Sequence, residues 1–479
     1  MKVCINHILI RKDVGFMISL LVIGMLVTAC NSNNNQKTPP NIIILLADDL
    51  GYADVGFHGS DIKTPNIDRI AKEGVRLESF YTAPVCSPTR AGLMTGRYPL
   101  RFGMMRAVIP PYRDFGLDPK EDILPEMLRR AGYNHRACIG KWHLGHQRKQ
   151  WLPNNQGFSH FYGCYNGAVD YFTHEREGEV DWHRNEQTVF EEGYTTDLIA
   201  TEASRFIESV PQNEPYFLYV PFNAPHSPFQ AKEEDLKKYQ HRPKGKKRTY
   251  AAMVDAMDQG IGNILKTIEE RGDLNNTFIL FFSDNGGVKN VGNNAPMKGN
   301  KFTVFEGGIR VAAAAIWKSG GVSGGKVIND HMGYIDVFPT LMDLAGIQEA
   351  PIKALDGISI LESLKGFSQK EEREWFSYID QSNERIERLA FHKGNKKLII
   401  SRPAIDNQNL EKSDQAVLYN ILNSHIEKID SADFSSALKA SLEKKIDSLL
   451  FYKASNQVAR YPIGKENFIA PENWIIKDE

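Results

Sequence analysis

The chain has 479 residues, of which 42% are hydrophobic and 24% are charged. This length and composition predict one large folded domain accompanied by a smaller one. The formal net charge is only −1, without the strong basic excess of a nucleic-acid-binding protein, so we expect no nucleic-acid partner.

Residues 1–30 have the pattern of a bacterial export signal. Basic residues precede the apolar run 15–27, which ends at Thr28-Ala29-Cys30. A basic start, a short apolar core and small residues before a cleavage site are typical of a secretory signal rather than a membrane span. Because Cys30 directly follows Thr28-Ala29, as in a lipobox, we expect it to be lipidated. The protein would then be an exported bacterial lipoprotein, anchored to a membrane in the periplasm or at the outer membrane. The alternative is a plain signal peptide with an incidental cysteine.

Residues 31–40 are polar and end in two prolines, which predicts a flexible tether. Beyond it, unbroken apolar runs alternate with helical patterns. Such runs are typical of strands buried on both faces of a parallel sheet. The strands are predicted at 41–46, 134–139, 216–220 and 277–282, and the helices at 66–73, 123–131, 195–209 and 250–271. The pattern predicts an α/β domain over 41–372, doubly wound around a large, mostly parallel sheet.

The pattern changes after about residue 370. Short strands are predicted at 375–378, 388–392 and 396–400, followed by an amphipathic helix over 435–450. We therefore predict a small antiparallel α+β subdomain over 373–479. Before it, the basic run 237–248 is interpreted as a solvated loop, with a guide for a polyanionic substrate as the weaker alternative.

The segment Cys86-Ser87-Pro88-Thr89-Arg90 matches the C-x-P-x-R signal that directs oxidation of a cysteine to formylglycine. The hydrate of this aldehyde is a geminal diol, which offers one hydroxyl to attack a sulfate ester and a second to expel the sulfate later. Cys86 is predicted at a helix start, with Pro88 in the first turn. The free N–H groups there favour an anionic ester. The alternative for the cysteine alone is a small buried apolar residue.

Polar residues gather where the predicted strands end, which is where open α/β sheets bind ligands. They are Asp48, Asp49, Lys141, His143, His226, Asp284 and Asn285. Three carboxylates and an amide oxygen suit Ca²⁺ or Mg²⁺. Lys141 and His143 alternate along a segment expected to be extended, so both side chains would reach the cleft. His226, on a proline-flanked loop, is a candidate general acid. Taken singly, each of these residues also fits a capping, structural or solvated role.

Together these residues resemble the formylglycine-dependent (type I) sulfatase family. The segments that carry the likeness occur in the family's order and are 41–54 (NIIILLADDLGYAD), 64–68 (TPNID), 86–97, 140–145 (GKWHLG), 224–228 (APHSP), 283–287 (SDNGG) and 305–310 (FEGGIR). The resemblance implies an alkaline-phosphatase-like sandwich fold and sulfuric ester hydrolysis. It also implies that Cys86 becomes the formylglycine nucleophile. Calcium would be bound by Asp48, Asp49, Asp284 and Asn285, together with the modified Cys86.

The resemblance also assigns the remaining roles. Arg90 and His143 would orient and activate the hydrated aldehyde, Lys141 and Lys301 would hold the sulfate, and His226 would protonate the departing sugar oxygen. A maturation enzyme that generates formylglycine is an implied partner. Within the family the likeness is nearest to the N-acetylgalactosamine 4-sulfatase (arylsulfatase B) branch, through segments 170–175 and 292–296. This indicates a sulfated galactose or galactosamine unit of a polysaccharide as the substrate.

Three further residues are candidates for sugar contacts, namely His174, Arg106 and His183. Two other functions remain open: a phosphate or phosphonate ester hydrolase on the same scaffold, and a non-catalytic lipoprotein that binds sulfated glycan. Cys138 and Cys164 are expected to be two buried thiols, with a disulfide between them as the alternative.

Overall fold

The computed structural model describes residues 39–367, 372–381, 387–401, 415–422, 426–429 and 436–476. Residues 1–38, including Cys30, the predicted signal and most of the predicted tether, lie outside the described residues. Of the helices in the described ranges, none combines the length and the apolar character needed to cross a bilayer.

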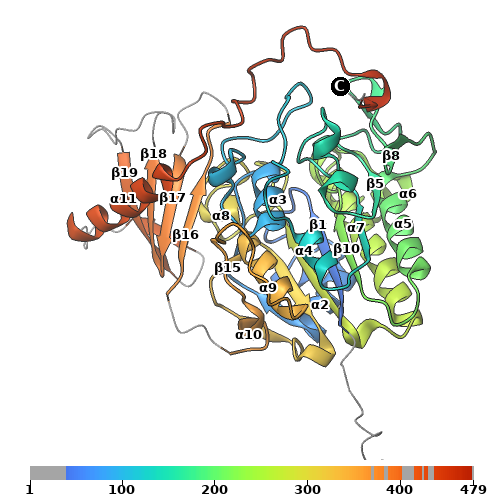
Figure 1. The fold of residues 1–479 in the computed structure, drawn as a ribbon, viewed down its shortest axis with the longest axis horizontal. Helices are drawn as coiled ribbons and strands as arrows, with labels where there is room; N and C mark the ends of the chain where they lie inside the picture. Colours follow the sequence, from blue (N-terminus) through green and yellow to red (C-terminus); the bar gives the residue numbers. More distant parts are fainter. Residues whose placement is uncertain are drawn as a thin grey trace, which may run out of the picture. The chain divides into compact units, whose positions relative to one another are not determined.

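A ten-stranded mixed sheet forms the centre of the fold (Figure 1). Its strands, from edge to edge, are β14 (Lys326–Ile328), β2 (Val75–Leu77), β13 (Ala313–Ile316), β11 (Thr277–Ser283), β1 (Asn41–Ala47), β10 (Tyr216–Pro221), β4 (His135–Ile139), β5 (His160–Gly163), β8 (His183–Arg184) and β9 (Gln187–Thr188). The five strands from β11 to β5 are parallel, whereas β13, β2 and β8 join antiparallel to a neighbour. This confirms the predicted large, mostly parallel sheet.

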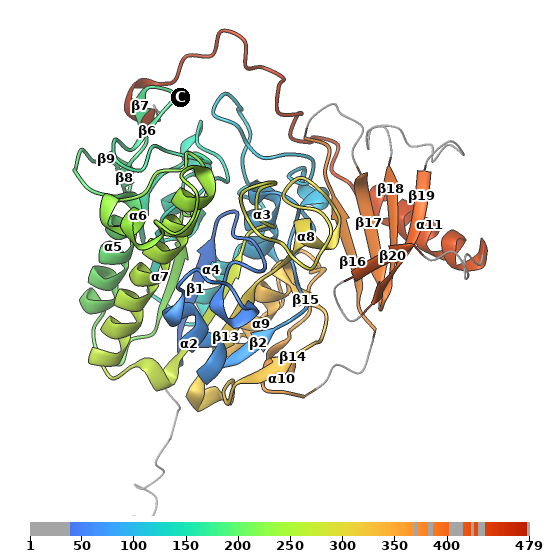
Figure 2. The ribbon, with the colours of Figure 1, turned by 180° about the vertical axis from the view of Figure 1, so that it is seen from behind.

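Helices cover both faces of this sheet because successive apolar side chains of β1 point to opposite sides. Ile42, Ile44 and Leu46 join one core cluster, and Ile43 and Leu45 join the other. The first cluster includes residues of α3 (Cys86–Thr95), α4 (Leu124–Arg130) and α9 (Val337–Leu344). The second includes residues of α2 (Pro65–Glu73), α5 (Thr195–Ser209) and α7 (Lys246–Glu270). Figure 2 shows α2, α5 and α7 in front of the sheet.

Shorter elements complete the part of the chain that contains the large sheet. They are the sheet β12 (Arg310–Val311), β3 (Phe80–Tyr81), β15 (Met332–Gly333), the hairpin β6 (Glu175–Arg176) and β7 (Glu179–Val180), and the helices α6 (Glu233–Lys238), α8 (Glu306–Ile309) and α10 (Leu361–Leu364). The predicted loop over 237–248 is only partly a loop, since α6 ends at Lys238 and α7 begins at Lys246. The basic side chains of this run are nevertheless exposed or half-buried.

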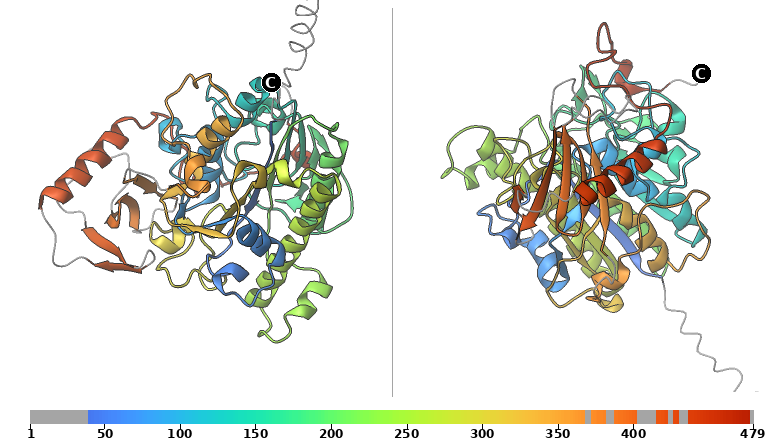
Figure 3. Two further views of the ribbon diagram at one scale, coloured as in Figure 1. Left: turned by 90° about the horizontal axis from the view of Figure 1, so that it is seen from below. Right: turned by 90° about the vertical axis from the view of Figure 1, so that its left-hand side faces the viewer.

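The C-terminal sheet is antiparallel, as predicted, but has two more strands than the sequence pattern indicated. It consists of β16 (Glu374–Tyr378), β17 (Glu387–Lys393), β18 (Lys396–Ser401), β19 (Gln415–Leu422) and β20 (Ile426–Ile429). Figure 3 shows α11 (Ser436–Phe451) lying across this sheet. Its residue Ile446 is buried. After α11, the chain returns over the part that contains the large sheet and hydrogen-bonds to it at Leu100, Gly103 and Arg176 (Figure 1).

Candidate active site

Cys86 is the first residue of α3 and is 1% exposed. Its Sγ lies 3.5 Å from Asp48 Oδ1 and 3.6 Å from Lys301 Nζ. Burial, followed by the nearby Asp284 carboxylate, raises the pKa of the Cys86 thiol well above its ordinary value. The unmodified side chain is therefore a neutral thiol. Because the thiolate is the reactive form of cysteine, this thiol is a poor nucleophile.

The predicted metal ligands come from two neighbouring parallel strands. Asp48 and Asp49 directly follow β1, and Asp284 and Asn285 directly follow β11, whose last residue is paired with the last residue of β1. This register places the four side chains at one sheet edge. The Asp49 N–H donates to Asp284 Oδ1 at 3.3 Å, and Asn285 Nδ2 donates to Asp49 Oδ1 at 2.7 Å.

Each buried carboxylate of this group is paired with a buried cation. Lys141 Nζ lies 2.5 Å from Asp48 Oδ2, Lys301 Nζ lies 2.7 Å from Asp49 Oδ1, and Arg90 Nη2 lies 2.8 Å from Asp284 Oδ2. All six side chains are at most 5% exposed. Burial alone would raise the pKa of Asp49, but foremost the charge of Lys301 lowers it to about 2. The site thus holds ionised oxygens and ammonium groups out of bulk water.

His226 lies on the far side of Asp49, with Nε2 3.6 Å from Asp49 Oδ2. Its Nδ1 is 2.6 Å from the Ser227 carbonyl, so Nδ1 carries a proton and donates. Burial, followed by the positive charge of Lys301, lowers the pKa of His226 to about 3. The free site therefore has a neutral His226 at neutral pH. An incoming anion would oppose the effect of Lys301 and favour its protonation.

The backbone conformation of His143 differs from the one that the sequence predicted. Its φ is 59°, so it occupies the left-handed region rather than the extended conformation expected from its alternation with Lys141. His143 Nε2 donates to the Ile109 carbonyl at 3.0 Å. Among the described residues, Nδ1 has no hydrogen-bond partner. Burial, followed by the Lys141 charge, lowers the pKa of His143 well below its ordinary range, so the imidazole is neutral.

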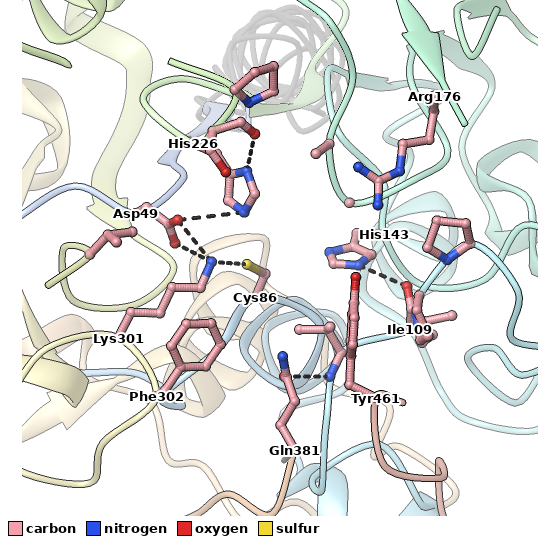
Figure 4. A pocket seen from close by; sticks show the side chains of 18 residues that line it. Asp49, Cys86, Ile109, His143, Arg176, His226, Lys301, Phe302, Gln381 and Tyr461 are labelled. Atoms are coloured by element: carbon pink, nitrogen blue, oxygen red, sulfur yellow. Dashed lines mark hydrogen bonds and ion pairs between the residues drawn. The ribbon is translucent and has the colours of Figure 1, made fainter. Parts of the chain in front are cut away.

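These side chains open into a cavity of about 570 Å³ (Figure 4). Of the predicted catalytic and metal-binding residues, Asp49, Cys86, His143, His226 and Lys301 line it, whereas the others are fully buried and do not line it. Lining residues that the sequence did not single out include Phe302, beside Lys301, and three others from distant segments: Arg176, Gln381 and Tyr461. No local motif marks these four residues, so only the folded chain reveals them.

The three predicted sugar contacts are not brought to this cavity. His174 is buried against the Trp182 ring, and its Nε2 donates to the Gly193 carbonyl. His183 stacks on Tyr165 and bonds to Asp181, while buried Arg106 lies near Asp380. Their polar groups therefore serve internal contacts. Cys138 and Cys164 are both free and buried, as expected.

A cation fits the oxygen-rich side of the cavity. Ligand atoms of Asp48, Asp49, Cys86 and His226 lie within 4.8 Å of one another. Within the described part of the chain, the buried Asn285 Oδ1 has no hydrogen-bond partner, which leaves a hard acceptor available beside Asp49. Carboxylate and amide oxygens are the ligands preferred by Ca²⁺ and Mg²⁺. Conversion of Cys86 to formylglycine would replace its soft sulfur with oxygen and extend this set.

Comparison with known proteins identifies the family. The family model described as Sulfatase matches residues 40–347. The chain is 36% identical to mouse arylsulfatase J over 68% of this chain and 56% of that protein, and 35% identical to human N-acetylgalactosamine-6-sulfatase over 68% and 66%. It therefore spans less than two thirds of the length of either relative.

Solved structures agree with this assignment. Ps i-CgsB, determined in complex with k-i-k-neocarrahexaose, superimposes with a TM-score of 0.78 and 31% identity, covering 88% of this chain and 95% of that one. The phosphonate monoester hydrolase of Agrobacterium radiobacter has a TM-score of 0.60 and 18% identity over 86% of this chain and 95% of that one, a likeness of fold alone. The alkaline-phosphatase-like sandwich implied by the sequence is thus confirmed, and the chain belongs to the sulfatase family.

Proposed function

We propose that this protein hydrolyses sulfate esters on a carbohydrate, with Cys86 converted to formylglycine as the nucleophile. The position of Cys86 carries the proposal. Its Sγ lies between a carboxylate, Asp48, and an ammonium group, Lys301, at 3.5 and 3.6 Å. Because burial holds the thiol in its neutral form, the C-x-P-x-R modification supplies what the unmodified residue lacks. The hydrated aldehyde would provide one hydroxyl to attack sulfur and a second whose deprotonation releases sulfate.

Asp48, Asp49, Asp284 and Asn285 would hold the metal ion, which we propose to be Ca²⁺, with Mg²⁺ as the alternative. When bound, the ion would supply positive charge against the sulfuryl oxygens. Two observations support this assignment: Asn285 Oδ1 has no hydrogen-bond partner among the described residues, and oxygens of Asp48 and Asp49 lie close together. Arg90 would keep the Asp284 carboxylate oriented through two hydrogen bonds, at 2.8 and 3.1 Å.

Lys141 and Lys301 would bind the sulfate oxygens as point charges, since an entering sulfate competes with Asp48 and Asp49 for the same ammonium groups. His143, whose Nδ1 has no hydrogen-bond partner among the described residues, would accept a proton from the hydrated aldehyde. His226 would protonate the departing sugar oxygen, because it lines the cavity while facing Asp49.

The substrate we propose is a sulfated galactose or galactosamine unit of a polysaccharide, such as a glycosaminoglycan or an algal galactan. Relatives support a carbohydrate: the human relative is an N-acetylgalactosamine-6-sulfatase, and Ps i-CgsB was determined with an oligosaccharide. The cavity mouth also suits a sugar, since the Phe302 ring, 40% exposed beside Lys301, offers an apolar face for a pyranose ring. An exported lipoprotein anchored through Cys30 would meet such polymers outside the cytoplasm, after a formylglycine-generating enzyme has modified Cys86.

Release of sulfate from defined oligosaccharides tests this function. The protein, produced together with a formylglycine-generating enzyme, is incubated with sulfated galactans and sulfated glycosaminoglycan fragments, and free sulfate is measured by ion chromatography. We expect sulfate release from at least one of them and none from Cys86→Ala. Faster turnover of matched phosphate or phosphonate esters would favour the alternative hydrolase. Binding of sulfated glycan by mature protein without any turnover would favour the non-catalytic alternative.

A further inference from the structure

One positively charged side chain lines the cavity but has no role in the proposed chemistry. Arg176, on hairpin strand β6, lines the same cavity as Cys86 and His143. Figure 4 shows its guanidinium directed into the cavity on the side of His143, across from Asp49 and Lys301. The cavity therefore presents positive charge on two separate walls.

The guanidinium of Arg176 is only weakly satisfied by the protein. Its Nε is buried and has no hydrogen-bond partner within the described ranges. The carboxylate paired with it belongs to Glu177, whose side chain is 45% exposed and lies 3.4 Å away. An exposed pair of this kind contributes little, whereas a buried donor without an acceptor is costly. By contrast, the buried cations of the site, such as Lys301, each have a buried carboxylate within 3 Å.

The backbone that carries Arg176 is held by the C-terminal segment. Trp474 Nε1 donates to the Arg176 carbonyl at 3.0 Å, and the Asn473 N–H donates to the Glu179 carboxylate across the hairpin at 2.8 Å. Trp474 is fully buried and packs edge-on against His146. The backbone position of Arg176 is therefore fixed before a ligand arrives, which reduces the conformational freedom lost on binding.

We propose that Arg176 binds a second oxyanion of the glycan, so that the protein prefers substrates that carry charge beyond the ester it cleaves. This inference rests on the proposed sulfatase function. A guanidinium matches the paired oxygens of a sulfate or a carboxylate, and such a group would satisfy the buried Nε. A cavity of about 570 Å³ is large enough for a sugar unit that places one anion at Lys301 and another at Arg176.

Two substrate pairs test the proposal and separate the two sources of the oxyanion. One pair is a galactan oligosaccharide with or without a second sulfate next to the scissile one. The other is a sulfated disaccharide with a uronate or with its methyl ester. We expect wild-type kcat/KM to be at least about tenfold higher for the more charged member of one pair, through KM, since the interaction is made equally in ground and transition states. In Arg176→Ala this ratio falls to about one, and in Arg176→Lys it lies between.

The matched control is Arg205→Ala on α5, whose side chain is 63% exposed and pairs with Glu202, away from the cavity. It should keep the wild-type ratio, and thermal unfolding of all variants checks that they fold. A wild-type protein that cleaves sulfate esters but shows no charge preference in either pair would overturn the role of Arg176. So would a preference that Arg176→Ala retains. If wild type cleaves no sulfate ester at all, the proposed function fails together with this inference.

Discussion

Replacing Lys397 with methionine should destabilise the protein because it breaks a buried ion-pair network. Lys397 Nζ, on β18, lies 2.9 Å from Glu306 Oε1 on α8 and 2.7 Å from Glu427 Oε1 on β20, and all three side chains are 0% exposed. Methionine is unbranched and only one atom shorter than lysine, but it carries no charge. Both carboxylates then lose their shared cation, and removing one partner of a buried pair costs about 3–5 kcal/mol of unfolding free energy.

The difference in unfolding free energy between the wild type and this variant should depend on pH. Burial alone would raise the pKa of Glu306, but Lys397 and then His392 lower it to about 2 in the wild type. The ionised Glu306 therefore stabilises the wild type above the ordinary pKa of glutamate, and this contribution is lost as the pH falls towards 2. Without Lys397, burial raises the pKa of both carboxylates. As the pH falls, protonation removes their uncompensated negative charge, so the variant is destabilised less. The stability difference should be largest near pH 7 and shrink towards pH 4.

Denaturant unfolding at several pH values provides the measurement, with Lys393→Met as the control. Lys393 is on the neighbouring strand β17, is 45% exposed and lies 3.3 Å from Glu374, so its loss should cost no more than about 1 kcal/mol. The double variant Lys397→Met/Glu427→Gln should recover part of the loss, because it removes one uncompensated charge. The reasoning is refuted if Lys397→Met costs no more than Lys393→Met at pH 7.

Three further predictions concern the site. His226→Ala should lower kcat for a sugar sulfate by about 10²–10⁴-fold. It should affect kcat for 4-nitrophenyl sulfate far less, because a nitrophenolate leaves without protonation. Equal losses of kcat on both substrates would exclude His226 as the general acid. Gly167→Ala should lower kcat without unfolding the protein, because a Cβ there would lie 2.4 Å from the His143 ring and displace it; unchanged kinetics would contradict a role for the His143 position. Removal of metal ions by a chelator should abolish sulfate release. Addition of Ca²⁺ or Mg²⁺ should restore sulfate release and raise the unfolding temperature. Restoration by Zn²⁺ alone would contradict the assignment of oxygen ligands.

The sequence predicted the centre of the fold better than its edges. The runs that became β1, β10 and β11 are long and apolar because both of their faces are buried, so they were recognisable. Strand β13, near one edge of the sheet, is only Ala313–Ile316, and three of its four residues are alanine, which has a low strand propensity. The run of basic residues over 237–248 suggested a solvated loop, but helix α7 begins at Lys246 although cations at a helix N-terminus oppose its dipole.

The residues of the site also differ in how well the sequence predicted them. Asp48, Asp49 and Asp284 could be placed together because parallel strands end at one sheet edge, and the register of β1 with β11 does bring them together. Arg176 and Tyr461 could not be predicted, because hairpin and C-terminal segments reach the cavity through long-range contacts that no local pattern records. His183 was a candidate for a sugar contact, but its side chain bonds to Asp181 inside the protein, and the sequence does not show such a bond.

The chemical state of Cys86 tests the central claim most directly. Trypsin should release Leu77–Arg90 with Cys86 as its only cysteine. In protein from cells that contain a formylglycine-generating enzyme, mass spectrometry should find this peptide with the mass loss expected when CH₂–SH becomes CHO, and the aldehyde should react with a hydrazide. The converted fraction should rise and fall with sulfatase activity across preparations. A preparation that hydrolyses sulfate esters at full rate while Cys86 remains entirely a thiol would contradict the account.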